Sequence, residues 1–167
     1  METKKMNKLT MTTEGDTHIV VIRHFNAPPE FVYRAHTEPE IVQKWLLGPD
    51  GWTMPGCVCE AVPGGKIRYE WANESKGESF FLTGEFVDLT PYSRLEQIER
   101  MHLPGPDNQL MVTPDNHVVT TFEADGSGTL MTMRMTLPDE ATRSMMLSSG
   151  MESGMEDSYV RLDEMSA

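Results

Sequence analysis

Cysteine is scarce in this sequence. Cys57 and Cys59 are the only two among 167 residues, and one residue separates them. That separation is too tight for an easy disulfide, and no further cysteine or histidine lies close by to complete a zinc site. We therefore expect two reduced thiols in the core or in a pocket, with a metal or redox role as the alternative. On this basis we expect no metal site and no cofactor.

Long apolar runs are also absent. No stretch is apolar over the roughly 20 residues that span a bilayer. Residues 1–15 are polar, carry Lys4, Lys5 and Lys8, and lack the apolar run of a signal peptide. The sequence therefore predicts a soluble, cytoplasmic protein without membrane insertion.

Basic residues are few. Fourteen Lys and Arg residues stand against 26 Asp and Glu residues, which gives a formal net charge of −12. Surfaces that bind phosphate groups usually cluster Lys and Arg, and this sequence has no such cluster. We therefore expect no nucleic-acid partner and no binding to an anionic membrane surface.

Known catalytic motifs are missing as well. The sequence contains no Gly-x-Ser-x-Gly, no phosphate-binding loop and no His-Glu-x-x-His, and its five histidines are scattered. The catalytic residues are therefore unknown. Polar strand residues usually lie on a solvated face, but one that faced a cavity would be a candidate general acid or base. The candidates of this kind are Glu60, Arg68, Glu70, Glu85 and Glu99.

The C-terminal part, Pro138 to Met165, has the apolar spacing of a long helix. Proline followed by two acids is typical of a helix start. Apolar residues then recur every three or four positions, which places them on one face. These residues are Leu147, Met151, Met155, Tyr159 and Leu162, and the same face carries Gly150, Gly154 and Ser158. Such a helix needs a concave partner surface.

The residues before this helix predict a β-sheet, which can supply the concave surface. His18 to Phe25 contains a β-branched run, and the prolines at 28, 29 and 39 begin two short helices. Alternating patterns between residues 57 and 137 indicate six further strands, with a long loop at 102–115. Short turns between them require antiparallel pairing, and a sheet of this size twists and curls. We expect an α+β domain over residues 17–167 and a flexible lead-in over residues 1–16.

Seven short motifs follow one another along the chain: Arg23-x-x-Asn26-Ala27-Pro28, Thr37-x-Pro39-Glu40, Lys44-Trp45 followed by Gly48-Pro49, Pro63-Gly64-Gly65-Lys66, Gly84-Glu85-Phe86, Pro91 with Arg94-Leu95, and Gly128-Thr129-Leu130. With these motifs the sequence resembles the START-like (SRPBCC) superfamily, and within it the group named after the activator of the heat-shock protein 90 ATPase. The resemblance covers roughly residues 17–162. It implies a helix-grip fold, in which a curved antiparallel sheet wraps a long C-terminal helix, and a cavity between them that relatives use for lipids, hormones or polyketides.

Periodicity assigns a set of aromatic and methionine side chains to the inward faces. They form either a filled core or the wall of a pocket, since methionine suits both. The candidate ligand-binding residues are Trp45, Tyr69, Trp71, Phe80, Phe86, Met133, Met151, Gly154, Met155 and Tyr159.

The leading hypothesis is a monomer or homodimer that binds a small hydrophobic or amphipathic molecule between sheet and helix. One alternative is a co-chaperone-like protein that acts on a heat-shock ATPase, as the name of the group suggests. The other is an enzyme of the cyclase, dehydratase or hydrolase kind, which requires a titratable group inside the cavity. The sequence leaves enzymatic activity undecided and gives binding precedence.

Overall fold

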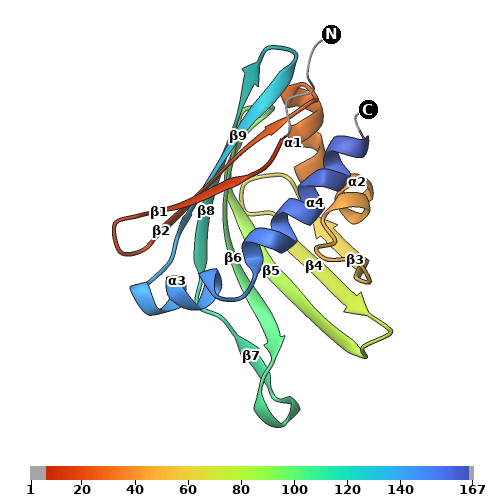
Figure 1. Ribbon diagram of the computed structural model, residues 1–167, viewed down its shortest axis with the longest axis vertical. Helices are drawn as coiled ribbons and strands as arrows, with labels where there is room; N and C mark the ends of the chain where they lie inside the picture. The colour runs from red at the N-terminus through yellow and green to blue at the C-terminus, as the bar shows by residue number, and fades with distance from the viewer. Residues whose placement is uncertain (1–6, 166–167) are drawn as a thin grey trace.

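A curved antiparallel sheet dominates the computed structural model, which describes residues 7–165 (Figure 1). Its strands are β1 (Thr10–Glu14), β2 (His18–Phe25), β3 (Thr53–Cys59), β4 (Lys66–Asn73), β5 (Glu78–Thr90), β6 (Arg94–Pro104), β7 (Leu110–Val112), β8 (Asn116–Asp125) and β9 (Gly128–Thr136). Its helices are α1 (Pro29–Thr37), α2 (Pro39–Trp45), the 3-10 turn η1 (Pro106–Asn108), α3 (Glu140–Leu147) and α4 (Met151–Met165). Among the described residues, no helix is long and apolar enough to cross a membrane.

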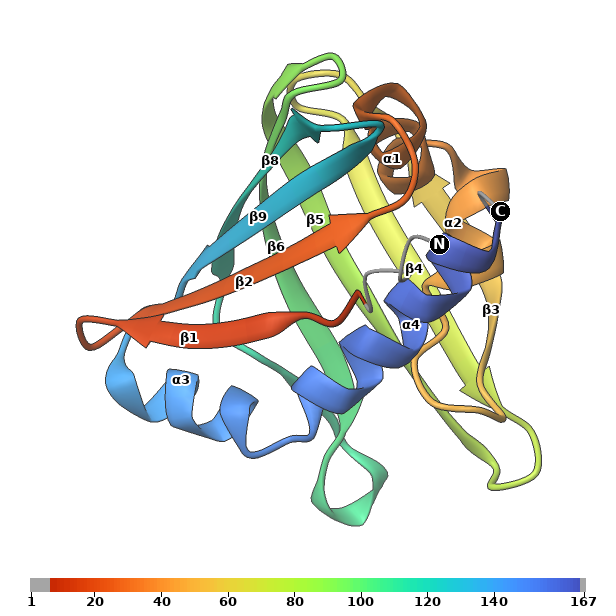
Figure 2. The ribbon, with the colours of Figure 1, turned by 45° about the horizontal axis from the view of Figure 1, so that its top comes forward.

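The strands follow the order β1-β2-β9-β8-β6-β5-β4-β3, with β7 paired to β6, and all pairs are antiparallel. Helix α4 runs across the concave side of this sheet (Figure 2). We call the side toward α4 the inner face. The predicted curved antiparallel sheet, the two short helices and the C-terminal helix are confirmed.

Strand β1 corrects the expectation of a flexible lead-in over residues 1–16. Thr10–Glu14 pairs with β2 in full register, from Thr10 opposite Ile22 to Glu14 opposite His18. This edge strand is mostly exposed and rich in threonine, so it has no apolar alternation to reveal it. Residues 1–6 of the expected lead-in lie outside the described part of the chain.

The expectation of a long loop over residues 102–115 is also wrong. Strand β6 continues to Pro104, and Leu110–Val112 returns beside it as β7. The three residues of β7 are all exposed, so an apolar run here forms a protruding hairpin and no core strand (Figure 1).

The C-terminal helix is shorter than the sequence predicts, because it breaks into α3 and α4. Gly150 lies between them with φ of 82°, a left-handed conformation that glycine adopts without a steric penalty. The hydroxyls of Ser148 and Ser149 donate to the carbonyl oxygens of Ser144 and Met146, at 2.9 and 2.6 Å. These bonds compete with continuation of the helix, so one apolar stripe is divided between two helices.

Candidate ligand-binding site

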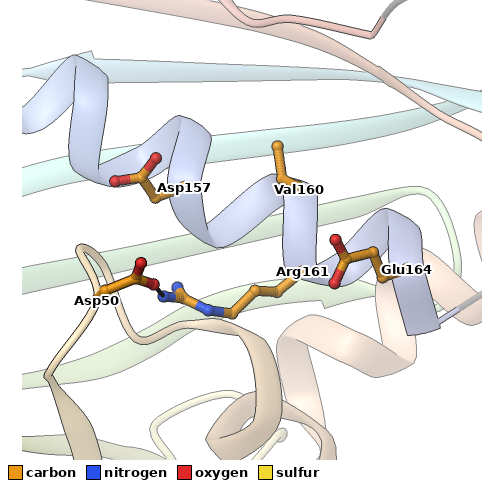
Figure 3. Close-up of a pocket in the computed structure, with 5 residues that line it drawn as sticks. All are labelled: Asp50, Asp157, Val160, Arg161 and Glu164. Atoms are coloured by element: carbon orange, nitrogen blue, oxygen red, sulfur yellow. Dashed lines mark hydrogen bonds and ion pairs between the residues drawn. The ribbon is translucent and has the colours of Figure 1, made fainter.

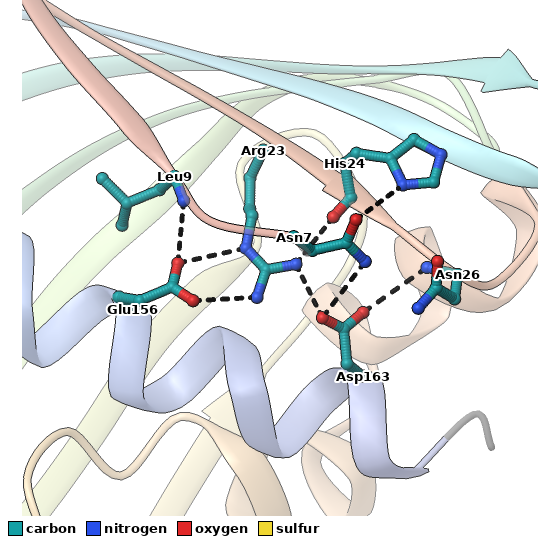
Figure 4. Close-up of polar contacts among 7 residues, drawn as sticks. All are labelled: Asn7, Leu9, Arg23, His24, Asn26, Glu156 and Asp163. Atoms are coloured by element: carbon teal, nitrogen blue, oxygen red, sulfur yellow. Dashed lines mark hydrogen bonds and ion pairs between the residues drawn. The ribbon is translucent and has the colours of Figure 1, made fainter. Parts of the chain in front are cut away.

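Helix α4 is fixed to the sheet by a buried arginine. The side chain of Arg23, on β2, is fully buried and donates to two carboxylates of α4 (Figure 4). Its Nε and Nη2 lie 3.1 and 3.0 Å from the two carboxylate oxygens of Glu156, and its Nη1 lies 2.7 Å from Oδ2 of Asp163. A bidentate pair of this kind fixes orientation as well as distance. The network therefore sets how far α4 stands from the inner face.

Backbone groups complete the same network. The amide of Leu9 donates to Oε1 of Glu156 at 2.8 Å, and the amide of Asn26 donates to Oδ1 of Asp163 at 3.4 Å (Figure 4). The chain before β1 and the turn after β2 are thereby tied to α4. In the sequence, Arg23 is recognisable only as part of a motif, and its partners on α4 were not predicted.

Two aromatic groups line the inner side. Tyr159 of α4 packs edge-on against Phe25 of β2 at 5.2 Å and stacks on Trp45 of α2 at 5.9 Å. The indole N–H of Trp45 donates to the carbonyl oxygen of Ala35 at 2.8 Å. This first group is fully buried and holds α2, α4 and β2 together.

The second group lies on β4 and β5. Trp71 stacks on Phe80 at 5.0 Å and meets Tyr69 edge-on at 5.8 Å. The indole N–H of Trp71 donates to the carbonyl oxygen of Leu46 at 2.8 Å. Tyr69 is buried, whereas Trp71 and Phe80 keep some accessible surface.

The remaining predicted site residues divide into buried and accessible ones. Phe86 is 2% exposed and belongs to the core. Met133 of β9 and Met151 and Met155 of α4 pack against that core but remain partly accessible. Side chains in a close-packed core normally have almost no accessible surface. These methionines therefore lie at the accessible margin of the core.

Gly154 is placed differently from the expectation. A Cβ at this position would meet only Pro49, at 3.7 Å from its Cδ. The neighbouring Ser158 accepts a hydrogen bond from the amide of Gly48 at 2.9 Å. Gly154 thus faces the loop after α2 and not the sheet, because its stripe on α4 lies beside that of Met155 and Tyr159.

Glu99 is the strand carboxylate that faces inward. On β6 it shares a face with buried Leu95, and burial raises the pKa of its carboxyl group, while a hydrogen bond from Gln97 lowers it. That bond runs from Nε2 of Gln97 to Oε2 of Glu99 at 2.8 Å. Glu99 keeps some accessible surface although it lies deep in the protein. Like the methionines, it is an inward residue that stays partly accessible.

The other strand candidates lie on the outer face. Arg68 and Glu70 form an ion pair at 2.8 Å, and Glu85 pairs with Arg100 at 2.9 Å. Glu60 is exposed and accepts from the amide of Lys66 at 2.8 Å. These groups are solvated ion pairs and turn contacts, so among the five candidates Glu99 alone remains for interior chemistry.

Asn116 and Gln97 lie on the inner face together with Glu99. The sequence analysis did not predict either of them as a site residue. Asn116 of β8 stands directly opposite Glu99 in the register and is 6% exposed. Both residues occupy the inward phase of their strands, and that phase was the available signal.

Tyr69 and Tyr159 add hydroxyl groups to this region. Burial raises the pKa of both, and the charge of Glu99 adds a smaller increase to each. Both hydroxyls are therefore protonated near neutral pH and can donate and accept hydrogen bonds.

Three more titratable groups lie at the α1 and β3 side. Burial lowers the pKa of His36 to about 4, and its Nδ1 pairs with the carbonyl oxygen of Val32 at 2.7 Å. Burial raises the pKa of Cys57 to about 11 and that of Cys59 to about 12. Both cysteines are free, as the sequence predicts. Protonated thiols of this kind are poor nucleophiles and poor metal ligands.

Two hollows at the surface of the described residues differ from the expected cavity. One, of about 280 Å³, lies on the outer side of α4 (Figure 3). It is lined by Asp50, Asp157, Val160, Arg161 and Glu164. The other, also about 280 Å³, lies at the ends of β4, β5 and β6 beside β7 and touches Trp71 and Phe80. Neither is bordered by Met133, Met155 or Tyr159. Among residues 7–165, no three His, Cys, Asp or Glu side chains cluster as a metal site would require.

A sheet that curves around a C-terminal helix, with two short helices after its second strand, defines a helix-grip protein of the START-like kind. Residues 26–167 match the family described as "Activator of Hsp90 ATPase homolog 1-like protein". The chain belongs to this family, as the motifs in the sequence predict.

Solved structures support the fold. A Rhodobacter sphaeroides protein is 28% identical with a TM-score of 0.83, over 95% of this chain and 97% of that one. Protein Ms6760 from Mycobacterium smegmatis is 18% identical with a TM-score of 0.82, over the same shares. An AHSA1-like protein from Aeromonas hydrophila is 17% identical with a TM-score of 0.70, over 89% of this chain and 93% of that one. The comparison with curated proteins gave no match.

Proposed function

We propose that this protein binds a small amphipathic molecule between the inner face of the sheet and α4. The supporting observation is the partial accessibility of inward side chains on both sides of that space. On the sheet these are Met101 and Met133, and on the helix Met151 and Met155. Methionine side chains are flexible enough to rearrange around a bound molecule.

The chemistry of the walls indicates the type of ligand. Thioether and aromatic groups favour an apolar body, and Glu99, Tyr69 and Tyr159 supply a few polar groups near it. Binding sites for small molecules usually combine an apolar lining with a small number of polar groups that fix orientation. The ligand is therefore amphipathic, with its apolar part against the methionines.

The test is a thermal-shift panel of hydrophobic and amphipathic compounds, with two variants. Met155→Trp fills the interior space, whereas Met145→Trp adds the same bulk on α3, where Met145 is 51% exposed. We expect a concentration-dependent rise in Tm for the parent and for Met145→Trp, but not for Met155→Trp. If no compound raises the Tm of the parent, the protein does not have this function.

An enzymatic role is a second candidate, because Glu99 meets its minimum requirement. A carboxyl group whose pKa is raised by burial, in an accessible interior position, is a possible general acid or base. Turnover of a bound compound by the parent, and its loss in Glu99→Gln, would support it. The co-chaperone alternative rests on the family description alone, and stimulation of a host Hsp90-type ATPase is its test.

A further inference from the structure

Glu99 and Asn116 stand side by side near the middle of the sheet. Glu99 lies on β6, and Asn116 is its direct partner on β8. On the other side, Gly84 of β5 is opposite Glu99. A Cβ at Gly84 would come within 3.2 Å of the Glu99 Cβ, so glycine leaves the acid free of a neighbouring side chain there. The strands thus present two acceptor groups side by side on the inner face.

Both groups have unused capacity to accept hydrogen bonds. Oδ1 of Asn116 is buried and has no hydrogen-bond donor among the described residues. Glu99 accepts one bond, from Gln97 at 2.8 Å, whereas a carboxyl group can accept several. A buried acceptor without a partner is costly, so such groups normally have one. A hydrogen-bond donor on a bound molecule would supply such a partner to both side chains.

We infer that the ligand presents a hydrogen-bond donor, a hydroxyl or an amino group, to Glu99 and Asn116, with its apolar part toward α4. This inference rests on the proposed function and specifies its substrate class. A carboxylate ligand would instead place a second negative charge beside Glu99.

The polar group of the ligand decides how Glu99 titrates. Burial favours the neutral carboxyl, which can exchange hydrogen bonds with a hydroxyl. An ammonium group would favour the ionised carboxylate and form a charge-assisted bond. Both ligands supply the donor that Asn116 requires, and the experiment separates them.

The probes are four compounds with the same alkyl chain: decanol, decylamine, decanoic acid and decyl methyl ether. The ether differs from the alcohol by a methyl group in place of the hydroxyl hydrogen, so it accepts hydrogen bonds but cannot donate them. Binding is measured by calorimetric titration at neutral pH. We expect decanol, decylamine or both to bind at least about tenfold more tightly than the ether and the acid, the usual scale for one unsatisfied buried partner.

Variants assign this preference to the two residues. Glu99→Met and Asn116→Leu are expected to reduce it to within about threefold, while each still binds the ether. Glu123→Met is the matched control, since Glu123 is exposed on β8. If Glu99→Met does not fold, the parent series and Asn116→Leu decide the question.

Three results would overturn the inference. If the ether or the acid binds as tightly as the donors, the ligand class is wrong while the binding function stands. If the preference survives in both variants, other residues receive the donor. If none of the four probes binds, the proposed function fails, and this inference fails with it.

Discussion

Arg23 and Glu156 lie 133 positions apart in the sequence, yet Nη2 of Arg23 is 3.0 Å from Oε2 of Glu156. The arginine is fully buried, and the carboxylates of Glu156 and Asp163 are each 18% exposed. A charged group in this environment needs its partners, because removal of one partner leaves the other charge poorly solvated.

We expect Arg23→Ala to lower the free energy of unfolding by about 3 kcal/mol, because the loss of one partner from a buried ion pair typically has an effect of this size. Urea denaturation measures it. Arg34→Ala is the control, since Arg34 of α1 and Glu38, the residue that follows this helix, form a solvent-exposed pair, and such pairs contribute little to stability. Equal effects from the two substitutions would mean that the Arg23 network does not hold α4 in place.

Gly154 and Gly150 should respond in opposite directions to the same substitution. Gly154 lies inside α4 with room for a Cβ, so Gly154→Ala should gain up to about 1 kcal/mol of helix propensity. Gly150 has φ of 82°, and Gly150→Ala should lose about 1 kcal/mol from backbone strain. Denaturant melts decide the signs, and a stabilised Gly150→Ala would indicate that α3 and α4 form one helix.

Gly65 is required for a close approach between strands. Its neighbour Gly64 is the one in the left-handed region, with φ of 80°, whereas a Cβ on Gly65 would collide with the carbonyl oxygen of Glu60. We expect Gly65→Val to lower stability by more than about 1 kcal/mol. Lys66→Val, at an exposed neighbouring position, should stay within about 0.5 kcal/mol. Similar melts for the two variants would contradict this turn geometry.

Glu99→Gln should change how stability depends on pH. Because the folded pKa of Glu99 is raised, the parent loses stability as pH rises from about 4.5, its ordinary value, toward the raised pKa. Glutamine does not titrate, so the stability of Glu99→Gln relative to the parent should increase between pH 4.5 and pH 7.5.

The measurement is the free energy of unfolding of both proteins across that range. Glu123→Gln, an exposed position, should differ from the parent by the same small amount at each pH. A constant difference for Glu99→Gln as well would show that Glu99 is solvated in the folded protein.

Local patterns predict the elements that have a strong period. Strand β4 is an example, because Ile67, Tyr69 and Trp71 alternate with polar residues and a Pro-Gly-Gly turn precedes them. The break at Gly150 and the short strands β1 and β7 were not predicted. Their side chains are mostly exposed or small, so hydrophobic periodicity carries no information about them.

The candidate site could be predicted only in part. Periodicity identified Trp45, Tyr159 and the methionines as inward, but it placed Gly154 one stripe away from its position on α4. It named Glu99 as one of several strand carboxylates and could not choose among them. The choice depends on which face of the sheet is covered, and that is a property of the whole fold.

The sequence by itself determined an antiparallel sheet with a helix at its C-terminal end, because strand alternation, turn residues and helix spacing are local properties of the chain. The tertiary structure alone decided that Arg23 binds Glu156 and Asp163 of α4, and that Glu99 stands beside Asn116. These contacts depend on strand register and on where α4 crosses the sheet. Both result from packing between distant segments, which no short stretch of sequence encodes.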